Sequence, residues 1–325
     1  MKQRRQSLFR RYGVIIIFIA LIIVSAFLSR AFLTVNNMMN LLRQNAALAL
    51  VSIGMLFVIL TGGIDLSVGS LLALSCVLTA NLLRTDPVWL VVVKVLGAGL
   101  LCGLFSGFAV VKAKVPPFVA TLAMMSMARG FAYTYSSGNA ISVSPIESFR
   151  FVGQGYIGPV PVPVIVAAVA AIIAGFVLQK TVFGRTLKAI GGNPEVVRLA
   201  GLPGGLYTAM AYALSAILCF ISGIILTSRL NVGSPMSGVG LELDAIAAVV
   251  IGGASLSGGK GSVLNTMFGV LTLGLIGNIM NILGVPSYPQ QIIKGIIILL
   301  AFIAGNEESI GSLFARFGLI KKRAA

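Results

Sequence analysis

The chain has 325 residues, of which 58% are hydrophobic and only 10% are charged, and its mean hydropathy is +1.02. Soluble domains carry about 25% charged residues, so this composition excludes a soluble enzyme or a disordered tail and indicates a polytopic membrane protein. The net charge of +16 comes from basic residues that lie between apolar runs, which excludes a nucleic-acid-binding domain.

Several kinds of chemistry are excluded by the residue types present. The chain contains no histidine, so histidine-based acid–base catalysis and histidine metal sites are impossible. Its three cysteines, Cys76, Cys102 and Cys219, lie far apart inside apolar runs. They are predicted to be small buried side chains, not a disulfide framework or a metal site. We therefore expect no catalytic residue, metal or cofactor.

Apolar runs predict an all-α fold of about ten transmembrane helices, since about 20 apolar residues cross the hydrocarbon core as a helix. In chain order the candidate spans are 13–29, 46–61, 66–83, 88–111, 115–135, 160–178, 206–228, 243–254, 263–283 and 289–305. The segments 46–61 and 243–254 are short, so eight or nine spans remain possible if one of them re-enters the membrane. The sequence thus predicts one transmembrane domain over residues 1–325.

The basic residues predict the orientation of these spans. Most of the 24 lysines and arginines fall on one side when the N-terminus is placed in the cytoplasm, which is the side that carries the excess of positive charge. An even number of spans then puts both termini there. The segments between and beyond the spans are predicted to be a cytoplasmic N-terminus (1–12), an outer loop (136–159), a cytoplasmic loop (179–205) and a cytoplasmic C-terminus (306–325).

Charged and small side chains also occur within the predicted spans. Two interpretations stay open for the basic ones, which either snorkel to the outer headgroups or line an outer vestibule. These residues are Lys94, Arg129 and Lys294. A ridge of glycines at every fourth position of the span 88–111 predicts close helix packing. It consists of Gly99, Gly103 and Gly107.

A glycine-pair pattern occurs twice, at 61–70 and at 251–260, each time after a short apolar segment. Glycine pairs end or break helices, and broken backbone at membrane depth persists only where protein or a watery cavity satisfies it. The pairs are either helix breaks that line the translocation route or its inner gate, or tight turns on the inner side. The candidate residues of the pathway or gate are Thr61, Gly62, Gly63, Asp65, Ser67, Gly252 and Gly253.

Asp65 is the most informative acidic residue, because a carboxylate at the membrane boundary is costly unless it is paired or hydrated. Binding of a polar substrate, closure of a gate and capping of the next helix are the three interpretations. The second glycine-pair passage ends in Gly258-Gly259-Lys260, which resembles the end of a phosphate-binding loop. That motif begins with a glycine and has a serine or threonine after the lysine, whereas this chain has Ala254 and Gly261 at those two positions, so the passage is not a phosphate-binding loop.

The cytoplasmic stretch 184–203 predicts a short surface helix. Asn193 is a capping residue, Pro194 suits the first helical position, and Gly201 with Pro203 ends the helix. The helix is expected to expose Val196, Val197, Leu199 and Ala200 around Arg198. Such a surface suits docking into a cleft of another protein, although lying flat on the membrane is the alternative. The candidate coupling residues are Gly191, Gly192, Asn193, Pro194, Glu195 and Arg198.

Four motifs taken in this order resemble the permease subunits of ribose-type ABC sugar importers, in the branched-chain amino acid and sugar permease superfamily. They are 59–70, 118–122 with Arg129-Gly130, Gly191-Gly192-Asn193, and 243–250 before Gly252-Gly253. The resemblance implies a bacterial inner-membrane subunit without ATPase activity that imports ribose or a related pentose or hexose. It also implies three partners: a cytoplasmic ABC ATPase, a periplasmic sugar-binding protein and a second permease copy, identical or paralogous. The stretch 184–203 would then contact the ATPase.

A neutral polyol suits this chain because few buried ions are available to hold a charged solute. The neutral polar side chains near the spans are Gln44, Asn45, Thr61, Asn278, Asn281 and Gln290. An ion-coupled secondary transporter is the alternative function. It should carry carboxylates at mid-membrane, whereas Asp65, Glu242 and Asp244 are predicted to lie at the ends of spans.

Overall fold

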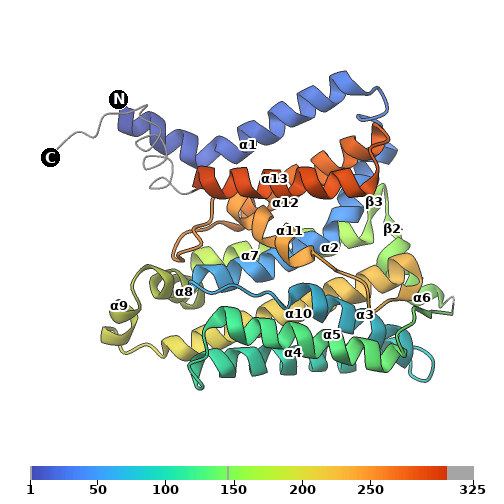
Figure 1. Cartoon of the computed structure of the whole chain (residues 1–325), viewed down its shortest axis with the longest axis horizontal. Coiled ribbons are helices and arrows are strands. Elements are labelled where there is room, and N and C mark those ends of the chain that lie inside the picture. The colour runs from blue at the N-terminus through green and yellow to red at the C-terminus, as the bar shows by residue number, and fades with distance from the viewer. Residues whose placement is uncertain (1, 145, 306–325) are drawn as a thin grey trace.

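Long helices run side by side between two ends of the molecule (Figure 1). The computed structural model describes residues 2–144 and 146–305, so the predicted C-terminal segment 306–325 lies outside the described residues. The long helices are α1 (Lys2–Leu28), α2 (Val35–Leu60), α4 (Val88–Val111), α5 (Pro117–Ser136), α7 (Val162–Lys180), α10 (Gly204–Leu230), α12 (Val263–Ile282) and α13 (Ser287–Gly305). Within the described residues, five of these, α2, α4, α7, α10 and α12, are long and apolar enough to cross a membrane.

The two ends of the molecule differ in their short elements. The α9 end, at the left of Figure 1, carries α8 (Val182–Gly192) and α9 (Pro194–Leu199). The α6 end, at the right, carries α6 (Glu147–Gln154) and four strands of two residues each. The start of α1 and the end of α13 both lie toward the α9 end. The predicted loops 136–159 and 179–205 therefore lie at opposite ends of the bundle.

The predicted short span 46–61 is wrong in its length. Helix α2 has 26 residues and begins at Val35, where the Thr34 side chain accepts a hydrogen bond from the backbone amide of Asn37. This is a helix cap. The residues from 36 to 45 are rich in asparagine and other polar side chains, and hydropathy alone assigns such a stretch to a loop. They are helical because several of these polar side chains line a cavity within the bundle.

Two passes of the chain are only partly helical. Helix α3 (Val68–Leu82) has 15 residues and α11 (Leu241–Ile251) has 11, which gives lengths of about 22 Å and about 16 Å against a hydrocarbon core of about 30 Å. Each begins near the middle of the molecule after a non-helical segment, 61–67 before α3 and 234–240 before α11 (Figure 1). The two segments enter from opposite ends. The predicted span 243–254 is thus not a complete helix.

The acidic residues of these two broken passes lie deeper than predicted. Asp65 belongs to the segment 61–67, and Glu242 and Asp244 belong to the first turn of α11. Because both α3 and α11 begin near the middle of the molecule, these carboxylates lie inside the bundle's length and not at the ends of spans. The prediction was wrong in depth because it placed these carboxylates at the ends of their apolar segments, whereas the helices that carry or follow them begin inside the bundle.

The α6 end is built from short paired elements. Strand β1 (Ile141–Ser142) pairs antiparallel with β4 (Val232–Gly233), and β2 (Tyr156–Ile157) pairs with β3 (Val160–Pro161). Helix α6 is fixed to α10 because the hydroxyl of Ser228 accepts a hydrogen bond from the Gly153 amide at 2.8 Å and donates to the carbonyl of Phe149. These elements form a small folded cap over this end, so the loop 136–159 is structured.

Helix α10 lies at the centre of the bundle and packs against α2, α3 and α4. The contact with α4 uses the predicted glycine ridge. A Cβ atom at Gly103 would stand 2.6 Å from the Cα of Ala213, and Cβ atoms at Gly99 and Gly107 would meet Phe220 and Ala209 of α10 equally closely. Only glycine allows this approach, so the predicted packing role is confirmed.

Candidate functional site

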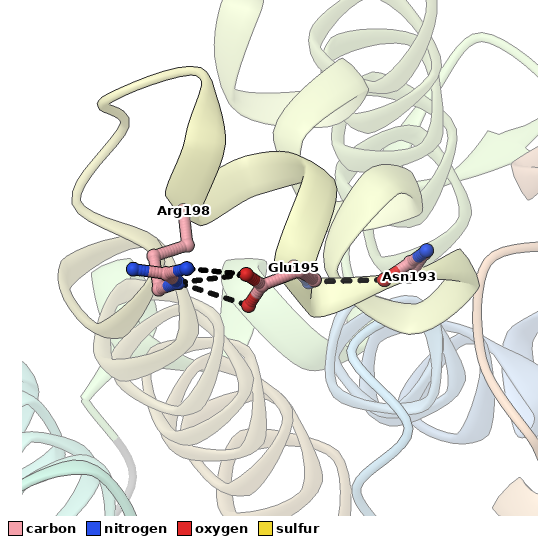
Figure 2. A network of polar contacts seen from close by, with 3 residues as sticks. All are labelled: Asn193, Glu195 and Arg198. Atoms are coloured by element: carbon pink, nitrogen blue, oxygen red, sulfur yellow. Dashed lines mark hydrogen bonds and ion pairs between the residues drawn. The ribbon is translucent and has the colours of Figure 1, made fainter.

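The cytoplasmic stretch predicted to form a surface helix does so at the α9 end. The Oδ1 atom of Asn193 accepts a hydrogen bond of 3.0 Å from the Glu195 amide and thereby caps α9 (Figure 2). Gly201 has a φ of +70° and ends the helix, and the amide of Leu202 bonds back to the carbonyl of Val197. The prediction of cap, first residue and stop is confirmed. The preceding helix α8, capped by Thr181, was not predicted.

The exposed face of α9 combines an ion pair with apolar side chains. Arg198 donates from Nε to Glu195 Oε2 at 2.9 Å, and both side chains point away from the bundle (Figure 2). This hydrogen bond from Arg198 lowers the pKa of Glu195. Val196 and Leu199 are 55% and 74% exposed. Apolar side chains this exposed, one turn apart around an ion pair, form a surface suited to a partner protein.

One residue of this helix was assigned to the wrong face. Val197 was expected to be exposed, but it is 3% exposed. It lies beneath α9, where its side chain faces Gly204 at the start of α10. The reason is helical geometry, since residues one apart lie about 100° from each other and a six-residue helix on a surface must bury one of its sides. Val197 therefore holds α9 against the bundle.

Three backbone turns meet directly behind α9. Gly191, near the end of α8, lies against the carbonyl of Leu60 and the backbone of Gly258, whose carbonyl carbon would be 2.8 Å from a Cβ at position 191. The Gly259 amide donates to the Leu60 carbonyl at 3.0 Å, and Gly258 lies equally close to the backbone of Gly62. We call this contact of Leu60, Gly62, Gly191, Gly258 and Gly259 the glycine junction. It joins α8 to the end of α2 and to the loop after α11.

The candidate coupling residues differ in their surroundings. A Cβ at Gly192 would have no neighbour within 4 Å, although Gly191 beside it is in close backbone contact. Within the candidate gate residues, Gly62 belongs to the glycine junction, whereas Gly253 faces open space. Gly252 and Gly253 were predicted from the glycine-pair pattern, but Gly258 and Gly259 were not. These two contact α8 and the end of α2, and such a contact between distant segments has no local sequence pattern.

Both predicted glycine pairs end helices by the same local device. The amide of Gly63 bonds to the carbonyl of Val58, and the amide of Ala254 bonds to that of Val249, while Gly62 and Gly253 have φ values of +82° and +79°. This is the Schellman arrangement, in which a left-handed glycine follows the last helical turn. The tight-turn interpretation therefore describes their backbone, and only the first pair also leads into a broken pass.

Asp65 is held inside the bundle by hydroxyl and amide groups. It is 2% exposed. Its Oδ1 accepts from the amide and the hydroxyl of Ser67, the amide at 3.0 Å, and its Oδ2 accepts from the Ser215 hydroxyl of α10 at 2.9 Å. Asp65 does not cap α3, because Ser67 is the N-cap residue and no described side chain bonds to the first-turn amides. The carboxylate instead holds the turn before α3 through Ser67 and ties it to α10 through Ser215. The hydroxyl of Thr61 is bonded to Val58 of its own helix.

A polar cavity of about 520 Å³ opens among α2, α10, α11, α12 and α13, on the α6 half of the bundle. We call it the outer cavity. Five of the six neutral polar side chains proposed from the sequence line it: Gln44, Asn45, Asn278, Asn281 and Gln290. The sixth, Thr61, lies at the other end of α2. Arg43 and Arg229 also line the outer cavity. The sequence did not identify them as cavity residues, because each lies at the end of a predicted span and was assigned to a loop.

Several polar side chains that line the outer cavity have hydrogen-bond or ion-pair partners within the protein. Asn278 and Asn37 exchange two hydrogen bonds of 2.9 and 3.0 Å, and Gln290 donates to Asn281 at 2.8 Å. Lys294 pairs with Asp244 at 2.9 Å. Lys294 therefore lines a vestibule and does not snorkel to headgroups, so for this residue the second interpretation fits.

The remaining two basic residues within spans have protein partners too. Lys94 pairs with Asp86 at 2.8 Å on the exposed turn before α4. Arg129 donates to the backbone carbonyls of Pro235 and Ser237 in the segment 234–240, the latter at 2.9 Å. Arg129 thus supports the irregular backbone of a broken pass, which sequence reasoning did not anticipate.

Comparison with known proteins assigns the chain to a family. Residues 37–302 match the family described as "Branched-chain amino acid transport system / permease component". The chain belongs to this permease family. It is 42% identical to "Ribose import permease protein RbsC" of Haemophilus influenzae, over 89% of this chain and 92% of that protein. The corresponding protein of Bacillus subtilis is 44% identical, over 90% and 91%.

A further relative of this permease family carries another sugar in its name. The "L-arabinose transport system permease protein AraH" of Escherichia coli (strain K12) is 39% identical, over 90% of this chain and 89% of that protein. No solved structure matches the chain. The resemblance found in the motifs is thus confirmed at the level of the family.

Proposed function

We propose that this chain is the permease subunit of an ABC importer that carries a monosaccharide, ribose or a related pentose or hexose, into the cytoplasm. Membership of the permease family and relatives of 40% identity or more that are named as ribose import permeases support this proposal. The observation that carries it is the glycine junction, which joins α8, the helix directly before α9, by backbone contact to the end of α2 and to the loop after α11. Mechanical input at α9 is what a subunit without its own energy source requires.

The chain crosses the bacterial inner membrane ten times, eight times by a long helix and twice by a broken pass, with both termini in the cytoplasm. The α9 end is the cytoplasmic side and the α6 end is the periplasmic side. The cluster of basic residues in the loops at the α9 end supports this orientation. Residues 1–325 form one transmembrane domain, in which 179–205 is the coupling loop and 136–159 is the periplasmic cap.

Three protein partners follow from this function. A cytoplasmic ABC ATPase receives α9 and hydrolyses ATP, so this chain is not itself an enzyme. A periplasmic sugar-binding protein docks at the α6 end and releases sugar into the outer cavity, whose amide side chains suit hydroxyl groups. A second permease copy, identical or paralogous, completes the membrane unit. Coupling is assigned to Gly191, Asn193, Pro194, Glu195 and Arg198, and the pathway or its gate to Thr61, Gly62, Gly63, Asp65, Ser67 and Gly252. Gly192 and Gly253 belong to the same two segments, but they face open space and take part only through the course of the backbone.

Purification and transport test this function together. The chain is expressed with its ATPase and binding protein, extracted in a mild detergent, and reconstituted into vesicles. The ATPase is expected to copurify, and labelled ribose is expected to accumulate only when ATP and the binding protein are supplied. Accumulation by the chain alone in response to a proton or sodium gradient would overturn the proposal in favour of an ion-coupled transporter.

A further inference from the structure

A second hollow, with both apolar and charged lining residues, lies on the other side of α11 from the outer cavity, where the two broken passes meet. It has a volume of about 300 Å³ and its lining comes from α3, α5, the segment 234–240 and α11. We call it the Arg129 pocket. Its lining residues are Ser70, Met125, Ser126, Arg129, Val239 and Glu242. The volume is at the lower end of the range for small-molecule sites in proteins, which suits a ligand of monosaccharide size.

The surroundings of this pocket are incompatible with contact to lipid. The segment 234–240 is non-helical near the middle of the bundle (Figure 1), and its Met236 and Val239 are 60% and 67% exposed. Irregular backbone at membrane depth is tolerated only where protein or water satisfies its polar groups. The Arg129 pocket therefore opens onto water or onto another protein.

The two charged groups of the pocket are not neutralised by a direct ion pair. Both hydrogen bonds that the described residues give Arg129 come from its Nη1 atom and go to backbone carbonyls. In the same part of the chain Glu242 is in no ion pair, whereas Asp244, two residues on, is paired with Lys294. Glu242 is held in place because its carboxylate lies against Gly69, where a larger residue would displace it. The Glu242 carboxylate and the Arg129 guanidinium thus line one pocket, and each has hydrogen-bonding atoms that no described residue occupies.

This combination of groups indicates the chemical class of ligand. A carboxylate accepts hydrogen bonds from hydroxyl groups, and a guanidinium donates through several N–H groups at fixed spacing. The nearby hydroxyls of Ser70 and Ser126 add groups that donate or accept. Because the charges of Arg129 and Glu242 cancel, a neutral ligand preserves the balance and a charged one does not.

We propose that the Arg129 pocket is a binding site for a neutral polyhydroxylated solute, at which the sugar is held near the middle of the membrane. This inference rests on the proposed function and adds a site to it. Broken helices that bring polar groups to the middle of the membrane are the usual construction of a substrate site in transporters, and charged side chains at that depth mark a substrate route.

Uptake by variants gives the first test. The complete importer is reconstituted, and ATP-driven uptake of labelled D-ribose and of L-arabinose is measured. Glu242→Gln is expected to lower uptake about tenfold, since it removes a charged acceptor, while leaving copurification of the ATPase unchanged. Asp86→Asn, on the exposed turn before α4, is the matched control and is expected to retain uptake. Equal uptake by the two variants would overturn the proposal.

Protection of an introduced thiol gives the second test, with a readout that does not depend on transport. Val239→Cys at the pocket and Met236→Cys on the same segment but outside it are compared in a Cys102→Ala background, in the complete importer. A water-soluble maleimide is expected to react with both, and an excess of the transported sugar is expected to slow only the reaction of Val239→Cys severalfold.

The outcomes separate the two proposals. No reaction at Val239→Cys, or no protection by sugar, would overturn the Arg129 pocket as a solute site while ATP-driven uptake by the unmodified importer still supported the proposed function. Absence of ATP-driven uptake of either sugar by the unmodified importer would instead contradict the proposed function itself.

Discussion

Replacement of Gly191 by alanine tests whether the glycine junction transmits motion from α9 to the membrane. The added Cβ would lie 2.8 Å from the carbonyl carbon of Gly258 and would also meet the Leu60 carbonyl, so α8 must shift away from α2. Overpacking of this kind costs about 1–3 kcal/mol. If that strain is relieved whenever α8 separates from the junction, the equilibrium between coupled and uncoupled states changes by about 5-fold to 150-fold.

Gly192→Ala is the matched control for this substitution, because a Cβ there meets nothing within 4 Å. The reconstituted importer is assayed for sugar transported per ATP hydrolysed. Gly191→Ala is expected to lower this ratio at least about fivefold relative to Gly192→Ala, with normal copurification of the ATPase because the exposed face of α9 is unchanged. A second matched pair has left-handed glycines at both positions: Gly258→Ala, in contact, against Gly253→Ala, in open space. Equal transport ratios within both pairs would refute the mechanical role of the junction.

Three further predictions concern the coupling surface and the buried acid. Leu199→Asp is expected to reduce copurification of the ATPase about tenfold, because a side chain that is 74% exposed in the free subunit becomes buried in the partner; unchanged copurification would place the docking surface elsewhere. Asp65→Ala is expected to lower the free energy of unfolding by at least about 1.5 kcal/mol, through loss of hydrogen bonds to a charged acceptor, and Asp65→Asn by less. If Asp65→Asn kept its thermal stability in detergent but abolished uptake, the carboxylate would serve transport and not only the packing of α3 on α10. Arg198 lowers the pKa of Glu195, so the stabilisation of α9 by this pair is complete above the ordinary glutamate pKa and is lost as the pH falls through the lowered value. ATPase binding measured against pH is therefore expected to be constant between about pH 7 and pH 5, and a decline in that range which Glu195→Gln abolishes would contradict this.

Local signals were enough to predict α9 from the sequence. Asn193, Pro194 and Gly201 act on the backbone within a few residues of themselves, so their effect does not depend on the rest of the fold. The ridge of Gly99, Gly103 and Gly107 was predictable for a similar reason, because its spacing places three small residues on one face of a helix.

The broken passes could not be predicted from the same kind of signal. The short run 243–254 and the glycine pairs left helix breaks open as an interpretation, but their positions were not predictable because the irregular segments before α3 and α11 are stabilised by distant groups. Ser215 bonds to Asp65 from 150 positions away, and Arg129 bonds to Ser237 from 108. Periodicity and hydropathy describe neighbours along the chain, so contacts of this range remain invisible to them. The position of Glu242 within the bundle was mispredicted for the same reason.

The contact between α4 and α10 has a consequence for how far a displacement can travel. Helix α10 has 27 residues, a length of about 40 Å. Gly103 and Gly107 of α4 lie against its backbone, and Gly99 lies against the Phe220 side chain. Close packing at Gly103 and Gly107 leaves little side-chain volume there to absorb a tilt, so we expect the two helices to move together. One end of α10, Gly204, adjoins α9, and the other, Leu230, forms part of the wall of the outer cavity. A displacement of α9 is therefore expected to reach the wall of the outer cavity as a tilt of α10.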